Sequence, residues 1–297
     1  MTRLGHLSTE GARAERAEID RLPTAELVRL MNADDAVIPT AVGEAQEAIA
    51  AAVDAIAARL EAGGRLIYVG AGTAGRIGVL DASECGPTFN TDRVVGVIAG
   101  GQVAVSTASE SAEDNRDAGK MAVGALGLGP ADAVVGISAS GRTPYVLGAV
   151  ERAQAAGALT IGISCNAGAE LSAAVEHPIE VLVGPEFIAG STRLKAGTAQ
   201  KLVLNMLSTL TMVRLGKTYG NLMVDVRVTN AKLRDRATRI VEEVAGVDRE
   251  RASAALAEAG DDAKVAVTML HAGSTADEAR ERLHAAGGHL RLALGER

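Results

Sequence analysis

The chain has few aromatic side chains and no tryptophan. Its 297 residues include three tyrosines and two phenylalanines, and aromatic residues make up 2% of the sequence. Single-stranded nucleic acids are bound largely by stacking bases on aromatic rings, and nucleic acids of every kind favour a basic protein surface. The formal net charge of -7 works against such a surface. We therefore expect neither nucleic acid nor an anionic membrane as a partner.

Cysteines and long apolar runs are also scarce. The two cysteines, Cys85 and Cys165, lie in unrelated segments without CxxC or Cys/His spacing. We expect no disulfide and no metal site from them, and predict that both thiols pack in the interior. No apolar run approaches the roughly 20 residues of a membrane-spanning helix. Residues 1–21 are charged throughout, without the apolar core of a signal peptide. These absences predict a cytoplasmic location.

Aliphatic residues, by contrast, are plentiful. Hydrophobic residues form 47% of the chain, enough for a full core. Between residues 66 and 219, short runs rich in valine and isoleucine alternate with alanine-rich helical segments. This alternation is typical of parallel strands joined by crossover helices. We predict strands at 66–70, 94–99, 133–138, 159–164 and 179–183, and helices at 75–84, 111–126, 144–156, 169–175 and 198–215. The expected fold is α/β, a doubly wound five-stranded parallel sheet of the flavodoxin-like type.

Helical segments flank this predicted core on both sides. Residues 1–63 are expected to form a helical arm, with helices at 25–31 and 42–60 and with Thr24 as an N-cap. Residues 64–228 form the predicted ligand-binding domain. Residues 229–297 change in composition to alanine, glutamate and arginine, and we expect a small helical domain there. Its predicted helices span 231–245, 248–259, 263–271 and 275–285.

A glycine-rich turn follows the first predicted strand. Its sequence, GAGTAG at residues 70–75, lets the backbone approach an anion at a helix N-terminus, which makes Gly72, Thr73 and Gly75 candidate phosphate ligands. The GxGxxG pattern alone is weak support for a dinucleotide. The next strand ends in VIAGG, without the acidic residue that would bind a ribose. The GxxxxGK[ST] motif of nucleoside triphosphate sites is also absent from the sequence.

A second polar loop follows the third predicted strand. Hydroxyls, backbone amides and one guanidinium precede Pro144, which suits the first position of a helix. The candidate phosphate ligands are Ser138, Ser140, Gly141, Arg142 and Thr143. The alternative is that Ser140 and Thr143 only cap the helix. Two such loops on neighbouring strands favour a sugar phosphate as the ligand.

Longer motifs give the sequence a specific resemblance. These motifs are LDASECGPTF (80–89), SAED (111–114), SASGRTPY (138–145), GSTRLKAGTAQK (190–201) and YGNLMVD (219–225). With them the chain resembles the sugar isomerase (SIS) fold and, more narrowly, the N-acetylmuramic acid 6-phosphate etherase family. The likeness spans nearly the whole chain. Two positions depart from the family pattern: Ala74 stands where serine is usual, and Gly86 where proline is usual.

The resemblance implies a reaction and two catalytic residues. The reaction is cleavage of the lactyl ether of N-acetylmuramic acid 6-phosphate by water, without a metal or organic cofactor, in a homodimer. Glu84 would be the proton donor and Glu113 the base, with Glu110 as an alternative to Glu113. Elimination across C2 and C3 needs a base that removes the C2 proton and an acid that protonates the leaving oxygen, and two carboxyl groups can divide these roles. The structural alternatives are that Glu84 is a solvated charge at a helix end and that Glu113 favours the first turn of its helix.

Two further cations are candidates for substrate anions. Arg193 and Lys195 precede the long predicted helix, where they could bind the phosphate or the lactyl carboxylate. The alternative for both is a solvated surface charge.

Two other functions compete with the etherase. One is a non-catalytic sugar-phosphate sensor similar to glucokinase regulatory protein. The other is an aldose-ketose isomerase, which needs a base at C2 but no acid at C3. Release of lactate would separate the etherase from both.

Overall fold

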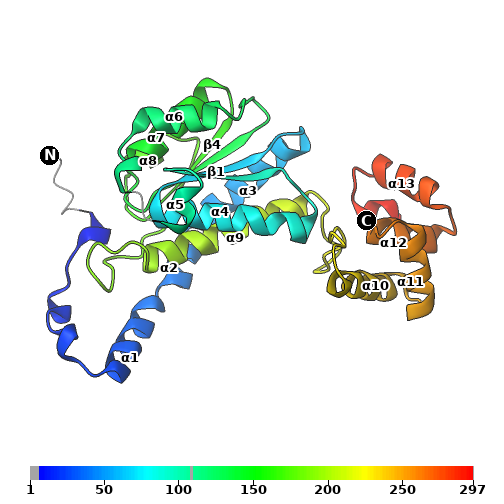
Figure 1. The fold of residues 1–297 in the computed structure, drawn as a ribbon, viewed down its shortest axis with the longest axis horizontal. Helices are drawn as coiled ribbons and strands as arrows, with labels where there is room; N and C mark the ends of the chain where they lie inside the picture. The colour runs from blue at the N-terminus through cyan, green and yellow to red at the C-terminus, as the bar shows by residue number, and fades with distance from the viewer. Residues whose placement is uncertain (1–6, 108–109, 297) are drawn as a thin grey trace. The chain divides into compact units, whose positions relative to one another are not determined.

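The computed structural model describes residues 7–107 and 110–296. Its centre is a five-stranded sheet with the order β2-β1-β3-β4-β5, and all of its neighbouring strands are parallel (Figure 1). The strands are β1 (Leu66–Gly70), β2 (Val94–Ile98), β3 (Ala133–Ile137), β4 (Leu159–Ser164) and β5 (His177–Glu180). The α/β class and the doubly wound parallel sheet predicted from the sequence are confirmed.

The aliphatic runs form the middle of this sheet because helices cover both of its faces. Every residue of β1, β3 and β4 is buried, whereas β2 at one edge is partly exposed. In the ladder between β1 and β3, Gly70 is the partner of Ile137. The two strands therefore end level with each other, and the segments that follow them start side by side.

The fifth strand lies earlier in the chain than its apolar run suggested. β5 covers His177–Glu180 and pairs with the end of β4. Val181 and Val183 are also buried, at 0% and 3% exposure, but the Val183 amide donates to the Val181 carbonyl in a local turn. The Val181 amide still donates to the Ser164 carbonyl of β4 at 2.9 Å, and the turn at Val183 then ends the pairing, so the predicted strand ended too late.

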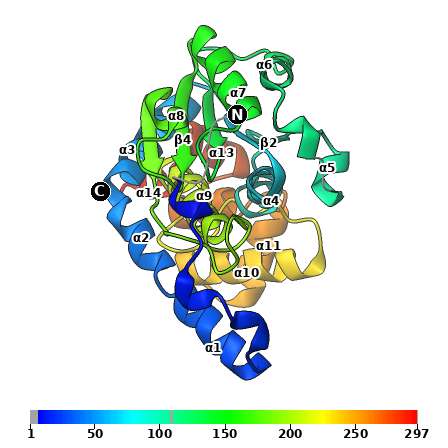
Figure 2. The same ribbon diagram turned by 90° about the vertical axis from the view of Figure 1, so that its left-hand side faces the viewer.

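Helices of the α/β part lie before, between and after the strands. They are α1 (Thr24–Asp35), α2 (Ile38–Glu44), α3 (Gln46–Glu61), α4 (Gly72–Phe89), α5 (Val103–Ser106), α6 (Arg116–Gly124), α7 (Pro144–Ala155), α8 (Glu170–Ala173) and α9 (Lys195–Arg214). The crossover through α4 leads from β1 to one side of the sheet, and the crossover through α7 leads from β3 to the other. Right-handed crossovers in opposite directions put α4 and α7 on opposite faces. Figures 1 and 2 both show α1 away from the sheet.

Local capping explains where the predicted helices were wrong. Pro23 rather than Thr24 occupies the N-cap of α1, and no side chain caps that helix. The predicted helix 42–60 is two helices, because the backbone of Ala45 leaves the helical conformation between α2 and α3. α6 starts five residues later than predicted, at Arg116, because the Asn115 side chain accepts a hydrogen bond from the Ala118 amide.

An ion pair joins the N-terminal ends of β1 and β3. Asp132 accepts hydrogen bonds from the Arg65 guanidinium at 2.8 and 3.1 Å, and from the backbone amides of Arg65 and Gly129 at 3.0 Å each. Burial alone would raise the pKa of Asp132, but these donors outweigh it and lower the pKa. The pair stabilises the end of the sheet opposite to the polar loops.

The chain forms two compact units. One comprises Met1–Ser83 and Arg93–Ser208, and the other comprises Glu84–Asp92 and Thr209–Arg297. The helices of the second unit are α10 (Ala231–Ala245), α11 (Arg249–Glu258), α12 (Ala263–Ala272), α13 (Ala276–Ala285) and α14 (Leu290–Ala293). Its core is aliphatic, and buried Lys264 is paired with Asp225 at 2.7 Å. The domain boundaries expected near residues 63 and 228 stay predictions.

Both cysteines are buried, as expected for packing residues. Burial, together with the negative charge of Glu186, raises the pKa of the Cys165 thiol to about 12. Cys165 therefore remains a neutral thiol at physiological pH. Across residues 7–107 and 110–296, no helix combines the length and hydropathy needed to cross a lipid bilayer.

Candidate active site

The direction in which strands are added to the sheet reverses between β1 and β3: β2 lies on one side of β1, whereas β3, β4 and β5 follow on the other. Open α/β sheets bind ligands beyond the carboxyl ends of their strands at such a reversal. The two polar loops predicted to bind phosphate are the segments that leave β1 and β3 at this point. The fold therefore brings together two loops that are more than 60 residues apart in the sequence.

The first loop is shorter than the sequence suggested. α4 already begins at Gly72, whose φ of +53° lets the chain turn from strand to helix within two residues. Gly75 lies close to β1 and β2, since a Cβ there would be 2.8 Å from the Gly70 carbonyl oxygen and 2.6 Å from Ile98 Cγ1. Thr73 is half-buried beside the start of α9, and Ala74 is buried. The loop thus offers the first turn of a helix to a ligand.

Hydroxyl groups hold the second loop together. Ser138 Oγ lies 2.8 Å from Thr143 Oγ1 and 3.3 Å from Ser140 Oγ, and it accepts a hydrogen bond from the Gly141 amide at 3.0 Å. Ser138 is buried, whereas Ser140, Arg142 and Thr143 are partly exposed. Thr143 is the N-cap residue of α7, but its side chain makes no capping hydrogen bond. A capping role therefore does not explain its hydroxyl.

The guanidinium of Arg142 lies beside the N-terminal arm. Arg142, Asn166 and Ser8 line a cavity of about 460 Å³. Asn166 joins the arm to the second loop: its Oδ1 accepts from Ser8 Oγ at 2.9 Å, and its Nδ2 donates to the Ala139 carbonyl at 2.9 Å. Within the described residues the Arg142 side chain has no hydrogen-bonding or ion-pairing partner. It is a free positive charge at the edge of the loop.

The two predicted catalytic glutamates are both exposed. Glu84 lies on α4, the helix that starts in the first loop. Glu113 lies between the 3-10 helix Glu110–Ala112 and α6, and its carbonyl accepts a hydrogen bond from the Tyr145 amide at 3.0 Å. Glu113 therefore precedes α6, so a preference for the first turn of a helix does not explain it. Glu110, the alternative base, begins the 3-10 helix.

An arginine missed by the sequence interpretation supports the segment that leads to Glu113. Arg76, on α4, donates from Nε to the Val105 carbonyl at 3.1 Å and from Nη2 to the Thr107 carbonyl at 3.2 Å. Its positive charge strengthens both bonds. No local sequence pattern points to this contact, because Arg76 lies about 30 residues before its acceptors.

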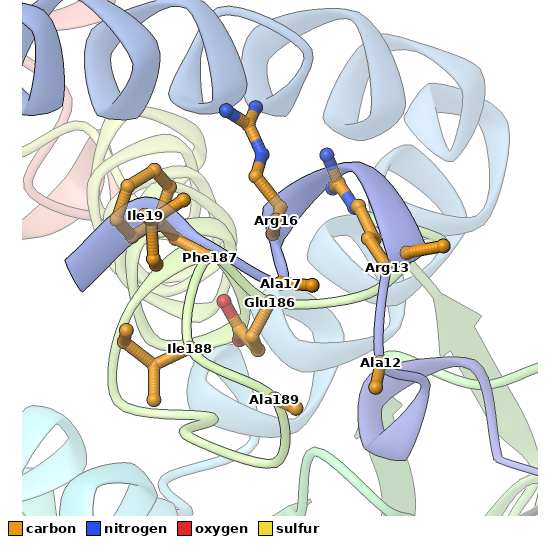
Figure 3. Close-up of a pocket in the computed structure, with 10 residues that line it drawn as sticks. Ala12, Arg13, Arg16, Ala17, Ile19, Glu186, Phe187, Ile188 and Ala189 are labelled. Carbon is orange, nitrogen blue, oxygen red and sulfur yellow. The ribbon is translucent and has the colours of Figure 1, made fainter. Parts of the chain in front are cut away.

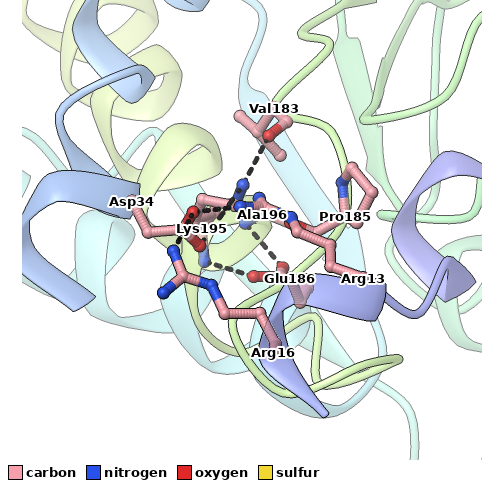
Figure 4. A network of polar contacts seen from close by, with 8 residues as sticks. All are labelled: Arg13, Arg16, Asp34, Val183, Pro185, Glu186, Lys195 and Ala196. Atoms are coloured by element: carbon pink, nitrogen blue, oxygen red, sulfur yellow. Dashed lines mark hydrogen bonds and ion pairs between the residues drawn. The ribbon is translucent and has the colours of Figure 1, made fainter. Parts of the chain in front are cut away.

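The structure places Lys195 in the interior, with 1% of the residue exposed. Its Nζ donates to the Val183 carbonyl at 2.8 Å and lies 3.7 Å from Asp34 Oδ2 (Figure 4). Burial lowers the pKa of this ammonium group, and the carboxylate of Asp34 opposes the shift. The alternative of a solvated surface charge is wrong for Lys195. Arg193, by contrast, is exposed, and no described residue is paired with its side chain.

The N-terminus of α9 is occupied by a carboxylate of the protein itself. Glu186, 2% exposed, accepts hydrogen bonds from the amides of Lys195 at 2.9 Å and Ala196 at 3.0 Å (Figure 4). The positive end of the α9 dipole is thus already compensated. A substrate anion has to bind elsewhere.

The arm packs on the same loop as Glu186. Arg13 is paired with Asp34 and donates to the Pro185 carbonyl at 2.7 Å. The guanidinium of Arg16 lies 5.3 Å from the centre of the Phe187 ring. A cavity of about 410 Å³ lies between the arm and this loop, lined mainly by small and apolar side chains (Figure 3). These contacts fix the arm to the α/β unit.

Comparisons with known proteins place the chain in a family. The N-terminal SIS domain of glucokinase regulatory protein matches residues 48–154, the SIS domain matches residues 109–210, and the C-terminal lid domain of glucokinase regulatory protein matches residues 220–276. A phosphoheptose isomerase structure from Francisella tularensis has a TM-score of 0.52 at 23% identity and covers 65% of this chain and 100% of its own, which supports the fold.

Full-length relatives are more specific. N-acetylmuramic acid 6-phosphate etherase from Rubrobacter xylanophilus is 63% identical over 296 residues, covering 99% of this chain and 98% of its own. The protein of the same name from Streptomyces avermitilis is 58% identical over 290 residues, covering 97% of this chain and 93% of its own. Both matches span nearly the whole chain, and the chain belongs to the N-acetylmuramic acid 6-phosphate etherase family.

Proposed function

We propose that this protein cleaves the lactyl ether at C3 of N-acetylmuramic acid 6-phosphate with water, giving N-acetylglucosamine 6-phosphate and D-lactate. The observation that carries the proposal is the 63% identity to an etherase across 99% of the chain. The position of the two polar loops at the reversal of the sheet agrees with a phosphorylated substrate.

The loops would bind the phosphate group. The Gly72–Gly75 turn of α4 supplies backbone amides and the Thr73 hydroxyl, and the second loop supplies the partly exposed Ser140, Thr143 and Arg142. We assign buried Ser138 to holding this loop in shape, because its Oγ is already bonded within the loop. Exposed Arg193 is the remaining candidate for the lactyl carboxylate.

Two exposed glutamates would carry out the elimination. Opening of the sugar ring gives a C1 aldehyde, which acidifies the proton on C2. Glu113 removes this proton, and Glu84 donates a proton to the lactyl oxygen as the C3–O bond breaks, so that lactate leaves. Water then adds to C3 of the unsaturated aldehyde, and C2 regains a proton. Each acid or base typically contributes about 10²- to 10⁴-fold to such a rate.

Lys195 has a different part in this proposal. Because its ammonium group is inside the protein, it stabilises the loop before α9 rather than contacting the substrate. Arg193 lies two residues earlier and is exposed. The loop thus exposes Arg193 for the substrate and is held in place by Lys195.

A regulator or an isomerase fits the fold but not the family. Two of the matching domains are those of glucokinase regulatory protein, and the isomerase likeness is one of fold alone. A sensor would bind the sugar phosphate without turnover, and an isomerase would exchange the C2 proton without losing lactate. Neither is favoured by the full-length etherase relatives.

Incubation of the purified protein with N-acetylmuramic acid 6-phosphate is expected to release D-lactate in amounts equal to N-acetylglucosamine 6-phosphate. A lactate assay and mass spectrometry of the sugar measure the two products. Folded protein that binds the sugar phosphate but forms no lactate would contradict the etherase assignment and point to the sensor.

We further propose that the protein acts as a homodimer. Met206, Leu210 and Val213 are 38%, 44% and 42% exposed and form one apolar stripe along α9. Leu210→Glu is expected to shift sedimentation from dimer to monomer, since it puts a charge into this stripe. Met121→Glu, at a more exposed apolar residue of α6, serves as the control and should leave the assembly unchanged. A monomeric parent protein would refute the proposal.

A further inference from the structure

A buried carboxylate lies one turn before Glu84 on the same helix. Asp81 is 4% exposed. Its Oδ2 accepts a hydrogen bond from the Tyr68 hydroxyl at 3.0 Å, and its Oδ1 accepts one from Lys201 Nζ at 2.8 Å. Tyr68 belongs to β1, Asp81 to α4 and Lys201 to α9. One carboxylate thus connects three elements of the α/β unit.

The helix that carries Asp81 lies very close to the sheet. A Cβ at Gly78 would be 3.0 Å from Tyr68 Cβ, and one at Gly96 of β2 would be 2.7 Å from Val79 Cα. These contacts set the distance of α4 from β1 and β2. Hydrogen bonds restrict the rotation of α4 about its own axis further, because they weaken steeply when the donor and acceptor move out of line.

The bonds of Asp81 set that rotation. Its two oxygens are held from different directions, by β1 beneath the helix and by α9 beside it. Residues three apart lie next to each other on a helix surface. The direction of Asp81 therefore fixes the direction in which Glu84 leaves the helix, and Glu84 itself is exposed.

The base has a separate support. The backbone of Glu113 is held by the amide of Tyr145 on α7, at 3.0 Å. α7 lies on the opposite face of the sheet from α4. Arg76 of α4 also supports the segment before Glu113, but it lies five residues before Asp81. A disturbance of the contacts around Asp81 should therefore act much more strongly on Glu84 than on Glu113.

We propose that Asp81 and Lys201 are positioning residues that hold Glu84 in the orientation for protonating the lactyl oxygen. The inference rests on the proposed function and adds to it two residues outside the substrate-binding loops. Lys201 contributes by holding Asp81 in place, and its side chain is 27% exposed. Misplacement of a catalytic group by about 1 Å can cost on the order of 10²-fold in rate.

The test compares two rates in the same protein. Lys201→Met is expected to lower D-lactate release on the order of 10²-fold, while exchange of the C2 proton with deuterated water changes by less than about threefold. Loss of both rates in equal proportion, or no change in either, would overturn the proposal. Wild-type protein that neither releases lactate nor exchanges the proton would refute the etherase function instead.

Two further variants separate positioning from stability. Asp81→Asn combined with Lys201→Met leaves no unpaired buried charge; we expect it to fold more stably than Lys201→Met but to release lactate equally slowly. Restored lactate release in this double variant would contradict positioning by the pair. The double variant also provides the measurement if Lys201→Met does not fold. Lys201→Arg keeps the charge and should recover part of the lactate release.

Arg65→Met is the matched control. Arg65 pairs with buried Asp132 at 2.8 Å, and its side chain is 32% exposed, close to the 27% of Lys201. This pair lies directly before β1, whereas Asp81 contacts Tyr68 in the middle of that strand. Arg65→Met should lower the urea midpoint of unfolding but keep the wild-type ratio of lactate release to proton exchange. A changed ratio in this control would show that any weakened ion pair has the same effect, and would overturn the specific role of Lys201.

Discussion

Glu84→Gln should abolish D-lactate release while the protein still exchanges the C2 proton of N-acetylmuramic acid 6-phosphate with deuterated water. Glutamine keeps the size of the side chain but donates no proton to the lactyl oxygen. Abstraction of the C2 proton does not need that acid. We expect lactate release to fall by about 10²- to 10⁴-fold.

Glu113→Gln should abolish both reactions, because no elimination occurs before the C2 proton is removed. Nuclear magnetic resonance of the C2 position in deuterated water measures the exchange, and an enzymatic assay measures lactate. Glu110→Gln is the control for the assignment of the base, since Glu110 lies three residues earlier. If Glu84→Gln loses exchange while Glu113→Gln keeps it, the two roles are reversed. If Glu110→Gln alone loses exchange, Glu110 is the base.

Gly141→Ala should weaken both the fold and phosphate binding. Gly141 has a φ of +66°, and a Cβ there would be 2.3 Å from Ala169 Cβ and 3.2 Å from Ser164 Cβ. The left-handed backbone alone costs an alanine about 1 kcal/mol. Neither Cβ can move without its backbone, so we expect overpacking to add roughly 1–3 kcal/mol.

The loop that has to shift is the one that would bind phosphate. The amide of Gly141 donates to Ser138 Oγ, and the amide of Arg142 donates to Ser140 Oγ at 3.2 Å. Loss of one charge-assisted hydrogen bond to the phosphate is worth about 1.5–3 kcal/mol, or on the order of 10- to 100-fold in affinity. Gly141→Ala should therefore raise the Kd for N-acetylglucosamine 6-phosphate by this factor, as measured by calorimetry.

Gly127→Ala separates the clash from the backbone strain. Gly127 has a φ of +61°, but no atom lies within 4 Å of a Cβ at this position. It should cost about 1 kcal/mol in urea unfolding and leave the Kd for the sugar phosphate unchanged. Equal effects of the two variants on binding would mean that the second loop does not bind the phosphate.

Much of the α/β architecture could be predicted because its signals are local. A strand buried on both faces is a short aliphatic run in the sequence. A helix is indicated by the periodic spacing of its apolar residues and by its capping residues. β1 and β4 were predicted residue for residue, as was α10. The errors came where a single side chain or turn decided the boundary, as with Asn115 before α6 and the local turn after β5.

The site could be predicted only in part. Glycine, serine and threonine after two strands indicate an anion site without any knowledge of the fold, because backbone amides and hydroxyls bind phosphate wherever they occur together. Lys195 shows the limit of this reasoning. Its place beside Arg193 suggested a ligand for the substrate, but the chain around it closes over the ammonium group and pairs it with Asp34.

The sequence by itself determined the order of strands and helices along the chain, the two polar loops and the family resemblance. Each of these depends on residues that are neighbours in the sequence. Only the tertiary structure decided which distant residues meet. Asp81 and Lys201 are 120 positions apart, and Ser8 and Asn166 are 158 apart. Such contacts have no local pattern, because they depend on how the helices pack against the sheet and on which buried charge needs a partner.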